Sequence, residues 1–274
     1  MDAASAGRAL ARALVDPDLH ATLSTPIHVV AAGKAASSMV VALAEQRRLS
    51  LRTMFGVATH VSDQLPASIE CHLAGHPLPD DRSVDAGRRV QRIAESVRPG
   101  ETLLLLLTGG ASSLLAVPAD GIRLDDKRRT IELMLHAGAD IGALNTVRKH
   151  LSAIKGGQLA MRCAGATLTL AVSDVVDDDV AVIGSGPGVA DETTWVDAAA
   201  ALERFGGSGH PPAVRERIAA GLAGLVPDTP KAQHPQLVRA RGRVIAGRQD
   251  VLAGARRAAE ALGYRVVVMS DPVT

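Results

Sequence analysis

Residues 103–115 read LLLLLTGGASSLL, an apolar run that passes directly into a turn of small residues. Five consecutive leucines are typical of a strand that is buried on both faces of a parallel sheet. The turn that follows contains Gly109, Gly110, Ser112 and Ser113. Its backbone N–H groups and hydroxyls are suited to binding phosphate or carboxylate. The segment therefore predicts a buried strand with an anion-binding turn at its carboxyl end.

A segment closer to the N-terminus has the same pattern. Residues 27–45, IHVVAAGKAASSMVVALAE, predict a strand over Ile27–Ala31, then Gly33 and Lys34 at a turn before a helix of small residues. The P-loop pattern GxxxxGK[ST] does not occur here. A lysine at such a turn can be a solvated loop charge. Beside other polar turns at one edge of a sheet, however, it favours neutralisation of a phosphate.

A third predicted strand, over residues 167–172, is followed by carboxylates. Asp174 comes almost directly after it, and Asp178 lies four residues further on. Carboxylates at the carboxyl end of a strand suit a Mg²⁺ ion that shares its ligands with a phosphate, although an acidic run can also be a plain turn. Ser185 and Gly186 form another tight turn, for which a structural role and a binding role are both open.

Residues 144–160, LNTVRKHLSAIKGGQLA, have apolar residues at helical spacing. This spacing predicts one helix, which Asn145 can cap, in which Arg148, Ser152 and Lys155 share a face. Gly156 and Gly157 can end this helix or let a ligand approach the backbone closely. Two cations and a hydroxyl on one face suit an anion. The same pattern also fits an amphipathic surface helix whose basic face is solvated.

Strands and helices alternate along the whole chain. The alternation predicts an α/β fold of three α/β/α layers, with a mostly parallel Rossmann-like sheet, helices on both faces and a ligand crevice at the carboxyl edge. We expect an α/β domain over residues 1–225. Residues 226–274 are expected to form a linker and a βαβ segment that returns to the main sheet or leads toward a further domain. The other predicted elements are strands over 54–60, 70–74, 244–246 and 265–269, and helices over 83–96, 124–137, 197–225 with a break at 206–212, and 250–262.

The composition excludes several classes of protein. The chain has 274 residues, is 47% hydrophobic, and has a net charge of +1. With four aromatic residues it offers neither the stacking platforms nor the basic field of a nucleic-acid-binding protein. No apolar run reaches spanning length, the N-terminus lacks the apolar core of a signal peptide, and Cys71 and Cys163 lack metal-ligand spacing. We therefore expect a cytoplasmic protein with reduced thiols and with neither nucleic acid nor membrane as a partner.

Six motifs carry a resemblance to a known family: GKAASSM, AGHPLPD, LLTGGASSLL, LNTVRKHLSAIKGGQLA, SDVVDDDVAVIGSGP and ADETTW. In this order and spacing they resemble the N-terminal domain of bacterial type II glycerate kinases, the glycerate 2-kinases, which are sometimes labelled hydroxypyruvate reductases. The resemblance extends from about Ala9 to the end of the chain, and residues 145–157 are its most specific block. It implies transfer of the γ-phosphate of ATP, with Mg²⁺, to the 2-hydroxyl of D-glycerate, giving 2-phosphoglycerate.

This reaction requires positioning and charge neutralisation, which these residue types can supply. Lys34 is expected to stabilise charge on the transferring phosphoryl group, Arg148 to hold the glycerate carboxylate, and Asp174 to bind Mg²⁺ or accept the hydroxyl proton. Asp178 is the second candidate metal ligand. The candidate binding residues for substrate or nucleotide are Gly33, Gly109, Gly110, Ser112, Ser113, Asn145, Lys155, Ser185 and Gly186.

Three further positions bear on the site. Asp177 and Gly188 stand where the family has Gly and Thr, so metal affinity and nucleotide handling could differ from those of relatives. His76, in GHPLPD, could be a general base or could fix a rigid loop.

The resemblance also implies that family members continue past a point like Ser270, with a second domain that closes over the site. We expect that domain to be absent here and the activity of this chain alone to depend on it. Open alternatives are an inactive or split-enzyme half that binds glycerate or nucleotide, a homodimer through an exposed apolar surface, and a separately encoded C-terminal domain. An NAD-linked hydroxypyruvate reductase is disfavoured because the chain has no GxGxxG after a strand.

Overall fold

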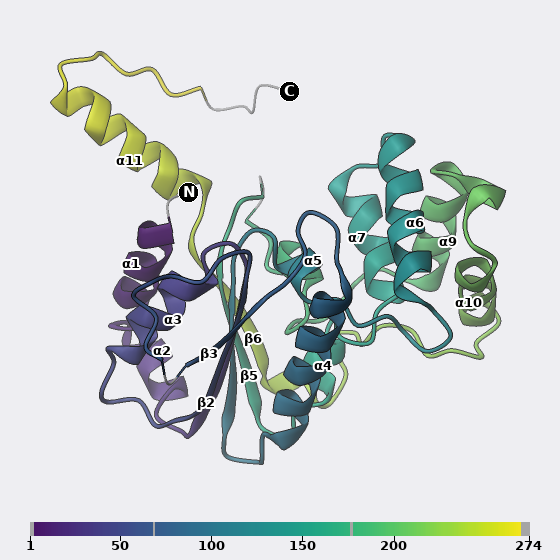
Figure 1. The fold of residues 1–274 in the computed structure, drawn as a ribbon, viewed down its shortest axis with the longest axis horizontal. Helices are drawn as coiled ribbons and strands as arrows, with labels where there is room; N and C mark the ends of the chain where they lie inside the picture. The colour runs from purple at the N-terminus through teal and green to yellow at the C-terminus, as the bar shows by residue number, and fades with distance from the viewer. Residues whose placement is uncertain (1–2, 68, 176–177, 270–274) are drawn as a thin grey trace.

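The computed structural model describes residues 3–67, 69–175 and 178–269, which form one parallel sheet of six strands (Figure 1). Helices cover both faces of this sheet, and the predicted three-layer α/β/α class is confirmed. From one edge to the other, the strands are β3 (Glu70–Leu73), β2 (Leu51–Ala58), β1 (Ile27–Ala32), β4 (Thr102–Leu107), β5 (Ala166–Val172) and β6 (Ala240–Ala246).

The central strands β1 and β4 are buried along their whole length. The pleat of β4 sends Leu104 and Leu106 to one face of the sheet and Leu103, Leu105 and Leu107 to the other, so its five leucines contribute to two separate cores. A continuous apolar run is the sequence that such a doubly covered strand requires.

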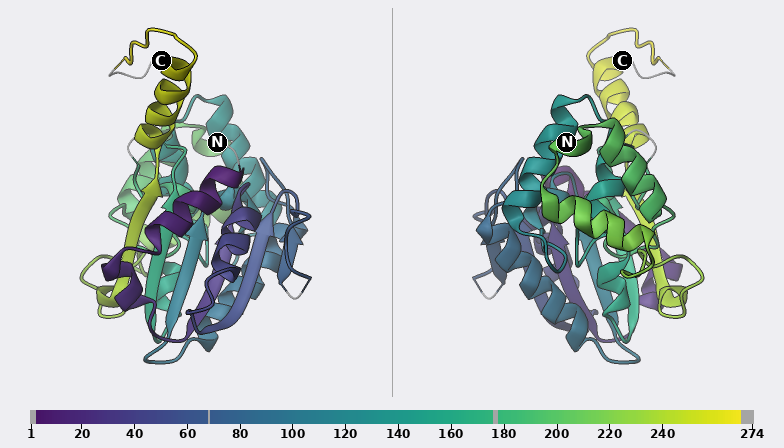
Figure 2. Two further views of the ribbon diagram at one scale, coloured as in Figure 1. Left: turned by 90° about the vertical axis from the view of Figure 1, so that its left-hand side faces the viewer. Right: turned by 90° about the vertical axis from the view of Figure 1, so that its right-hand side faces the viewer.

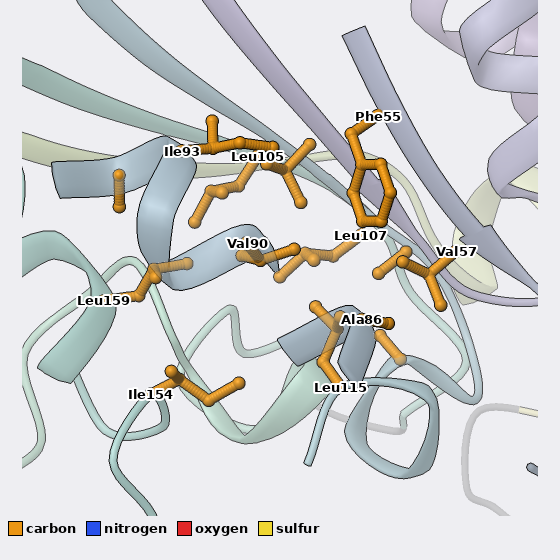
Figure 3. Close-up of a cluster of buried hydrophobic side chains, with 14 of the residues drawn as sticks. Phe55, Val57, Ala86, Val90, Ile93, Leu105, Leu107, Leu115, Ile154 and Leu159 are labelled. Atoms are coloured by element: carbon orange, nitrogen blue, oxygen red, sulfur yellow. The ribbon is translucent and has the colours of Figure 1, made fainter. Parts of the chain in front are cut away.

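Two sets of helices cover the sheet. The left-hand view of Figure 2 shows α1 and α3 lying across one face, where they pack with α2 in one apolar cluster. On the other face, Val90 and Ile93 of α4 lie against Phe55, Leu105 and Leu107 (Figure 3). The helices of the two faces are α1 (Ala3–Ala13), α2 (Pro17–Thr22) and α3 (Ala36–Ala44), then α4 (Asp81–Ser96), α5 (Ala111–Leu114) and α8 (Gln158–Met161).

Four more helices form a lateral lobe beside the sheet (Figure 1). They are α6 (Leu124–His136), α7 (Ile141–His150), α9 (Trp195–Arg204) and α10 (Pro212–Leu222). The lobe has its own apolar core, which includes Met134, Trp195 and Phe205. A buried ion pair of 2.9 Å between Lys149 and Asp191 ties α7 to the segment before α9.

The predicted helix over residues 144–160 is wrong beyond His150. α7 is capped by Asp140, whose carboxylate accepts a hydrogen bond from the N–H of Ala143 at 2.8 Å, so Asn145 is not the cap. The helix ends because the chain that follows pairs with a distant segment: the N–H of Ala153 donates to the carbonyl of Val117 at 3.0 Å. Arg148, Ser152 and Lys155 therefore do not share a helical face, since this long-range pairing overrides the local pattern.

The last part of the described chain differs in one element from the prediction. β6 returns to the main sheet beside β5, and α11 (Arg248–Ala261) leaves the sheet without a buried residue (Figure 1). The predicted strand over residues 265–269 is wrong, because this segment has no neighbouring strand with which to form a ladder. The other predicted elements are found, with boundaries that differ by four residues or fewer. The short 3₁₀ helices are η1 (Ile183–Ser185), η2 (Gly207–Gly209) and η3 (Leu237–Arg239).

Within the described ranges, no helix combines the length and the apolar character that crossing a bilayer would require.

Candidate functional site

The strand order reverses between β1 and β4, and the turns that follow these two strands meet at the carboxyl edge of the sheet. The chain runs outward from β1 through β2 to β3 and then crosses back to β4. The backbone N–H of Lys34 donates to the carbonyl of Gly109 at 2.9 Å, and that of Ala35 donates to Oγ1 of Thr108 at 3.1 Å. Ligands of open α/β sheets bind at such a switch point. The two turns thus lie side by side, as the sequence predicted.

Two glycines are required by close approach in these turns. Gly33 has φ +133°, and a Cβ there would lie 2.7 Å from the carbonyl oxygen of Thr108. A Cβ at Gly109 would collide with a carboxylate oxygen of Asp174. The structure therefore brings Asp174, from the end of β5, directly against the turn after β4.

Lys34 and His76 border the next residue of that turn. A Cβ at Gly110 would lie 3.2 Å from Nε2 of His76 and 3.4 Å from Cγ of Lys34. Partial burial and the Lys34 ammonium lower the pKa of His76, against an opposing effect of the Asp174 carboxylate. A lowered pKa leaves the imidazole neutral at pH 7, the form that accepts a proton.

A cavity of about 360 Å³ lies beside this group, between residues 77–79, the Ser112–Ser113 turn and α6. Lys127, Arg148 and Lys155 all line it, although they come from three different places in the chain. A larger cavity of about 640 Å³ lies beside α4 and residues 117–125, and none of the predicted site residues lines it. We therefore take the smaller, cationic cavity as the candidate site.

Lys155 is buried, and its ammonium contacts only neutral oxygens in the described structure. It donates to the carbonyl of Ser112 at 2.8 Å, to Oγ of the same serine at 3.1 Å and to the carbonyl of Gly184 at 3.4 Å. Burial, followed by the charges of Lys127 and Arg148, lowers the pKa of Lys155 well below its ordinary range. This cation has no compensating negative charge in the contacts described.

A chain of hydrogen bonds fixes Ser112 and thereby Lys155. The hydroxyls of Ser112 and Ser185 are 2.8 Å apart, and Oγ of Ser185 donates to Oδ1 of Asn145 at 2.9 Å. Asn145 in turn donates to the carbonyl of Val182 at 3.2 Å. The structure thus brings together four predicted site residues, with Asn145 and Ser185 behind the two that line the cavity.

The turn that holds Ser185 is unusual in its backbone. Gly184, Ser185 and Gly186 have φ values of 63°, 62° and 59°, and a serine in this region is uncommon. The carbonyls of Ser185 and Gly186 accept hydrogen bonds from the N–H groups of Gly156 and Gly157 at 2.9 and 2.8 Å. The turn is therefore anchored to the segment that follows Lys155. Ser113 has a separate role, since its Oγ donates to the carbonyl of Pro77 at 2.5 Å.

Lys127 is a cavity residue that is not among those predicted from the sequence. It is 5% exposed, and its Nζ has no hydrogen-bond partner among the described residues. Burial, with the charges of Arg148 and Arg217, lowers the pKa of Lys127 to about 7. Its spacing could have identified it, because it lies four residues before Ile131 and seven before Met134, on the buried stripe of α6.

The predicted metal ligands remain a prediction. Asp174 is exposed, while Asp178 lies against Gly247 with one buried carboxylate oxygen that lacks a partner in the described parts of the chain. No group of three or more His, Cys, Asp or Glu side chains in those parts could hold a metal ion. Mg²⁺ usually takes one or two carboxylates together with phosphates and water, so an orphaned carboxylate oxygen fits this ion. Asp177 lies outside the described residues.

The second departure from the family pattern, Gly188, lies in the protein interior. A Cβ there would collide with Oγ1 of Thr169 and would lie 2.6 Å from Cδ1 of Leu105. The hydroxyl of Thr169 is itself buried without a partner in the described structure. A threonine at position 188 would therefore not fit this chain, and the departure concerns packing against β4 and β5.

Comparisons with known proteins agree with this fold. Residues 1–219 match the family model described as "Domain of unknown function (DUF4147)". The glycerate 2-kinase of Pyrococcus horikoshii is 35% identical over 245 residues, which cover 89% of this chain and 54% of that protein. A putative hydroxypyruvate reductase of Agrobacterium vitis is 39% identical over 246 residues, which cover the same shares. The crystal structure of a Thermotoga maritima glycerate kinase has a TM-score of 0.79 and 32% identity, covering 96% of this chain and 61% of that one.

The chain spans about half the length of the curated relatives it matches. The family model nevertheless matches most of the chain, and the solved kinase shares both its sequence and its fold. The chain belongs to the DUF4147 family, the glycerate kinase family that includes these relatives.

Proposed function

We propose that this chain is the substrate-binding part of an ATP-dependent glycerate 2-kinase, which phosphorylates D-glycerate at its 2-hydroxyl to give 2-phosphoglycerate. One observation carries the proposal: Lys127, Arg148 and Lys155 converge on one cavity beside the Lys34 turn. Buried cations of this kind are suited to an anionic substrate, because charge-assisted hydrogen bonds are strongest away from water. The names of the relatives support glycerate as that substrate.

In the proposed reaction the 2-hydroxyl oxygen attacks the γ-phosphorus of ATP. A new O–P bond forms while the bond from the γ-phosphorus to the β,γ-bridging oxygen breaks, and ADP leaves with that electron pair. The hydroxyl proton passes to Asp174 or to the neutral imidazole of His76, which lie beside the same turn. Arg148 binds the glycerate carboxylate, and Lys34 stabilises charge on the transferring phosphoryl group.

The remaining predicted residues have supporting roles in this proposal. Gly33 and Gly109 let the turns of the switch point approach Thr108 and Asp174 closely, and the backbone of Gly109, Gly110 and the Ser112–Ser113 turn would bind phosphate oxygens. Asn145, Ser185 and Gly186 position Lys155 and Ser112. Asp174 and Asp178 would hold Mg²⁺, which would neutralise phosphate charge when bound.

The cellular compartment of the enzyme, its partners and its further domain are also proposals. We place the reaction in the cytoplasm, with a small hydroxy acid as the partner and without nucleic acid or membrane. A homodimer, or a C-terminal domain supplied by another polypeptide, would complete the site of the α/β domain, for which we propose residues 1–225 together with β6, which joins the same sheet. The chain from residue 226 onward would lead toward that further domain.

A coupled assay of ADP release tests the proposal. The purified chain is supplied with D-glycerate, ATP and Mg²⁺ beside Lys34→Ala and, as a control, Arg129→Ala, which removes an exposed cation from α6. We expect glycerate-dependent ADP release that Lys34→Ala abolishes and Arg129→Ala retains. Binding of glycerate without turnover would instead indicate a half-enzyme that needs a second domain. The proposal is contradicted if the chain shows neither binding of glycerate nor turnover.

A further inference from the structure

The cavity that Lys127, Arg148 and Lys155 line has an excess of positive charge. None of the ion pairs in residues 3–67, 69–175 and 178–269 includes any of the three. Glu132 also lines the cavity but is not paired with them. Burial without a partner disfavours the charged form of Lys127 and Lys155 and lowers the pKa of each, so an anionic ligand that pairs with these two lysines and the half-buried Arg148 would favour their charged forms.

The charge of the cavity exceeds that of glycerate. A hydroxy-acid carboxylate supplies one negative charge and would leave most of the positive charge unpaired. A phosphate monoester adds about 1.5 to 2 negative charges at pH 7, so a phosphorylated hydroxy acid carries close to three in all. Arg128, which is paired with Asp125, and Glu132 also line the cavity, so basic groups remain in excess and a ligand with more than one negative charge suits this excess better than glycerate does.

The shape of the cavity is compatible with such a ligand. Its volume of about 360 Å³ is at the lower end of the range of roughly 300–1,000 Å³ that is usual for small-molecule sites. Leu78, Ile131 and Leu135 form part of its wall, and Ser112 and Ser113 add hydroxyls. Apolar walls exclude water and strengthen the attraction between the cations and an anion inside.

Lys127 and Arg148 are suited to different anionic groups. A guanidinium matches a carboxylate through two parallel hydrogen bonds, whereas an ammonium on a four-carbon stem is a mobile point charge that follows a phosphoryl group. Lys155 is already held by Ser112 and Gly184, but the Nζ of Lys127 has no partner in the described structure. Lys127 therefore has all the donors of its ammonium group available for a ligand.

We propose that this cavity binds the carboxylate and the phosphoryl group of a phosphorylated hydroxy acid together, and that Lys127 is a binding residue for the phosphoryl group. The inference rests on the proposed function and deepens it, because it assigns the reacting end of the substrate to this cavity. The phosphorylated acid is accordingly bound more tightly than the acid from which it forms.

Isothermal titration calorimetry of the full chain with 2-phospho-D-glycerate, D-glycerate and inorganic phosphate tests the inference. Wild type is compared with Lys127→Met and with the matched control Arg129→Met, which removes an exposed cation from the same helix. We expect Lys127→Met to weaken binding of the phosphorylated acid by about 10- to 100-fold, the loss of one charge-assisted hydrogen bond, and to weaken glycerate binding by a clearly smaller factor. Arg129→Met should change neither.

The possible results separate the inference from the proposed function. If wild type binds neither organic acid, the inference and the glycerate kinase proposal both fail, even where inorganic phosphate binds; if wild type binds D-glycerate but not the phosphorylated acid, only the inference fails. If Lys127→Met binds all ligands as wild type does, or if wild type binds none, the inference is overturned. Retained glycerate binding in Lys127→Met also shows that the variant is folded.

Discussion

Replacement of Lys127 by methionine should stabilise the ligand-free protein. Methionine is unbranched and flexible, so it fills a similar space without a charge. In the folded protein the ammonium is buried and faces the guanidinium groups of Arg148 and Arg217, while Lys155 lines the same cavity. The lysine therefore opposes folding, and its retention is explained by the ligand rather than by stability.

The size of the effect follows from the pKa of Lys127. Its fall from the ordinary value of 10.5 to about 7 corresponds to roughly 5 kcal/mol, at about 1.4 kcal/mol for each pH unit. The unfolded chain keeps the proton up to pH 10.5, whereas the folded protein releases it above about pH 7. The destabilisation is thus complete below pH 7 and disappears as the pH rises to 10.5.

Urea unfolding, followed by circular dichroism at two pH values, measures this difference. Lys127→Met should exceed wild type in free energy of unfolding by up to roughly 5 kcal/mol at pH 6.5, and by about 1 kcal/mol at pH 9.5. The control Arg129→Met, on the exposed side of α6, should stay within about 0.5 kcal/mol of wild type. The reasoning is refuted if Lys127→Met is less stable than wild type at pH 6.5, or if its gain is the same at both pH values.

Three other substitutions test the site and its surroundings. Lys34→Ala should lower kcat in the ADP-release assay by about 10²- to 10³-fold, because we propose that its ammonium stabilises the transferring phosphoryl group. The melting temperature should not change, since the Lys34 side chain is exposed, and a loss of stability that accounts for the lost activity would contradict this role. Gly109→Ala should displace the Asp174 carboxylate, so a titration of activity with Mg²⁺ should show a weaker apparent affinity for the ion. An unchanged Mg²⁺ titration would argue against Asp174 as a metal ligand. Gly188→Thr should destabilise the protein by about 1–3 kcal/mol in urea unfolding, and Thr169→Ala in the same chain should restore part of that loss if the two side chains collide.

The layers of the fold could be predicted from local patterns. Leu103–Leu107 are all fully buried, as a continuous apolar run at the centre of a parallel sheet must be. The end of α7 could not be predicted in this way. It depends on the hydrogen bond from the N–H of Ala153 to the carbonyl of Val117, two residues far apart in the sequence, and the pattern of residues 144–160 carries no sign of this contact.

The residues of the candidate site also fall into two groups, those that topology predicts and those that depend on tertiary packing. Topology alone brings Lys34, Gly109 and Asp174 together, because parallel strands deliver their following turns to one edge. Lys127 was not predicted, since it lies in the run DDKRR, which has the composition of a solvated helix face. Its burial depends on how the lateral lobe packs beside the sheet. The support of Lys155 by Ser112 and Ser185 likewise depends on three segments that only the folded chain brings into contact.

The location of these cations in the molecule explains how the protein tolerates them. An unpaired buried charge costs several kcal/mol, a large part of the 5–15 kcal/mol by which typical proteins are stable. Two or three fully buried leucines, at about 1.5–3 kcal/mol each, offset one such charge, and β4 alone places five in the cores of the sheet. The cations lie on α6, α7 and the segment after it, which also place Ile131, Val147 and Ile154 in apolar cores, so the same elements carry both the unpaired charges and part of the burial that offsets them. A ligand that pairs with these charges should stabilise the folded protein, and the gain in free energy of unfolding should grow with the ratio of ligand concentration to Kd. Binding to the cavity can therefore be measured as a rise in melting temperature.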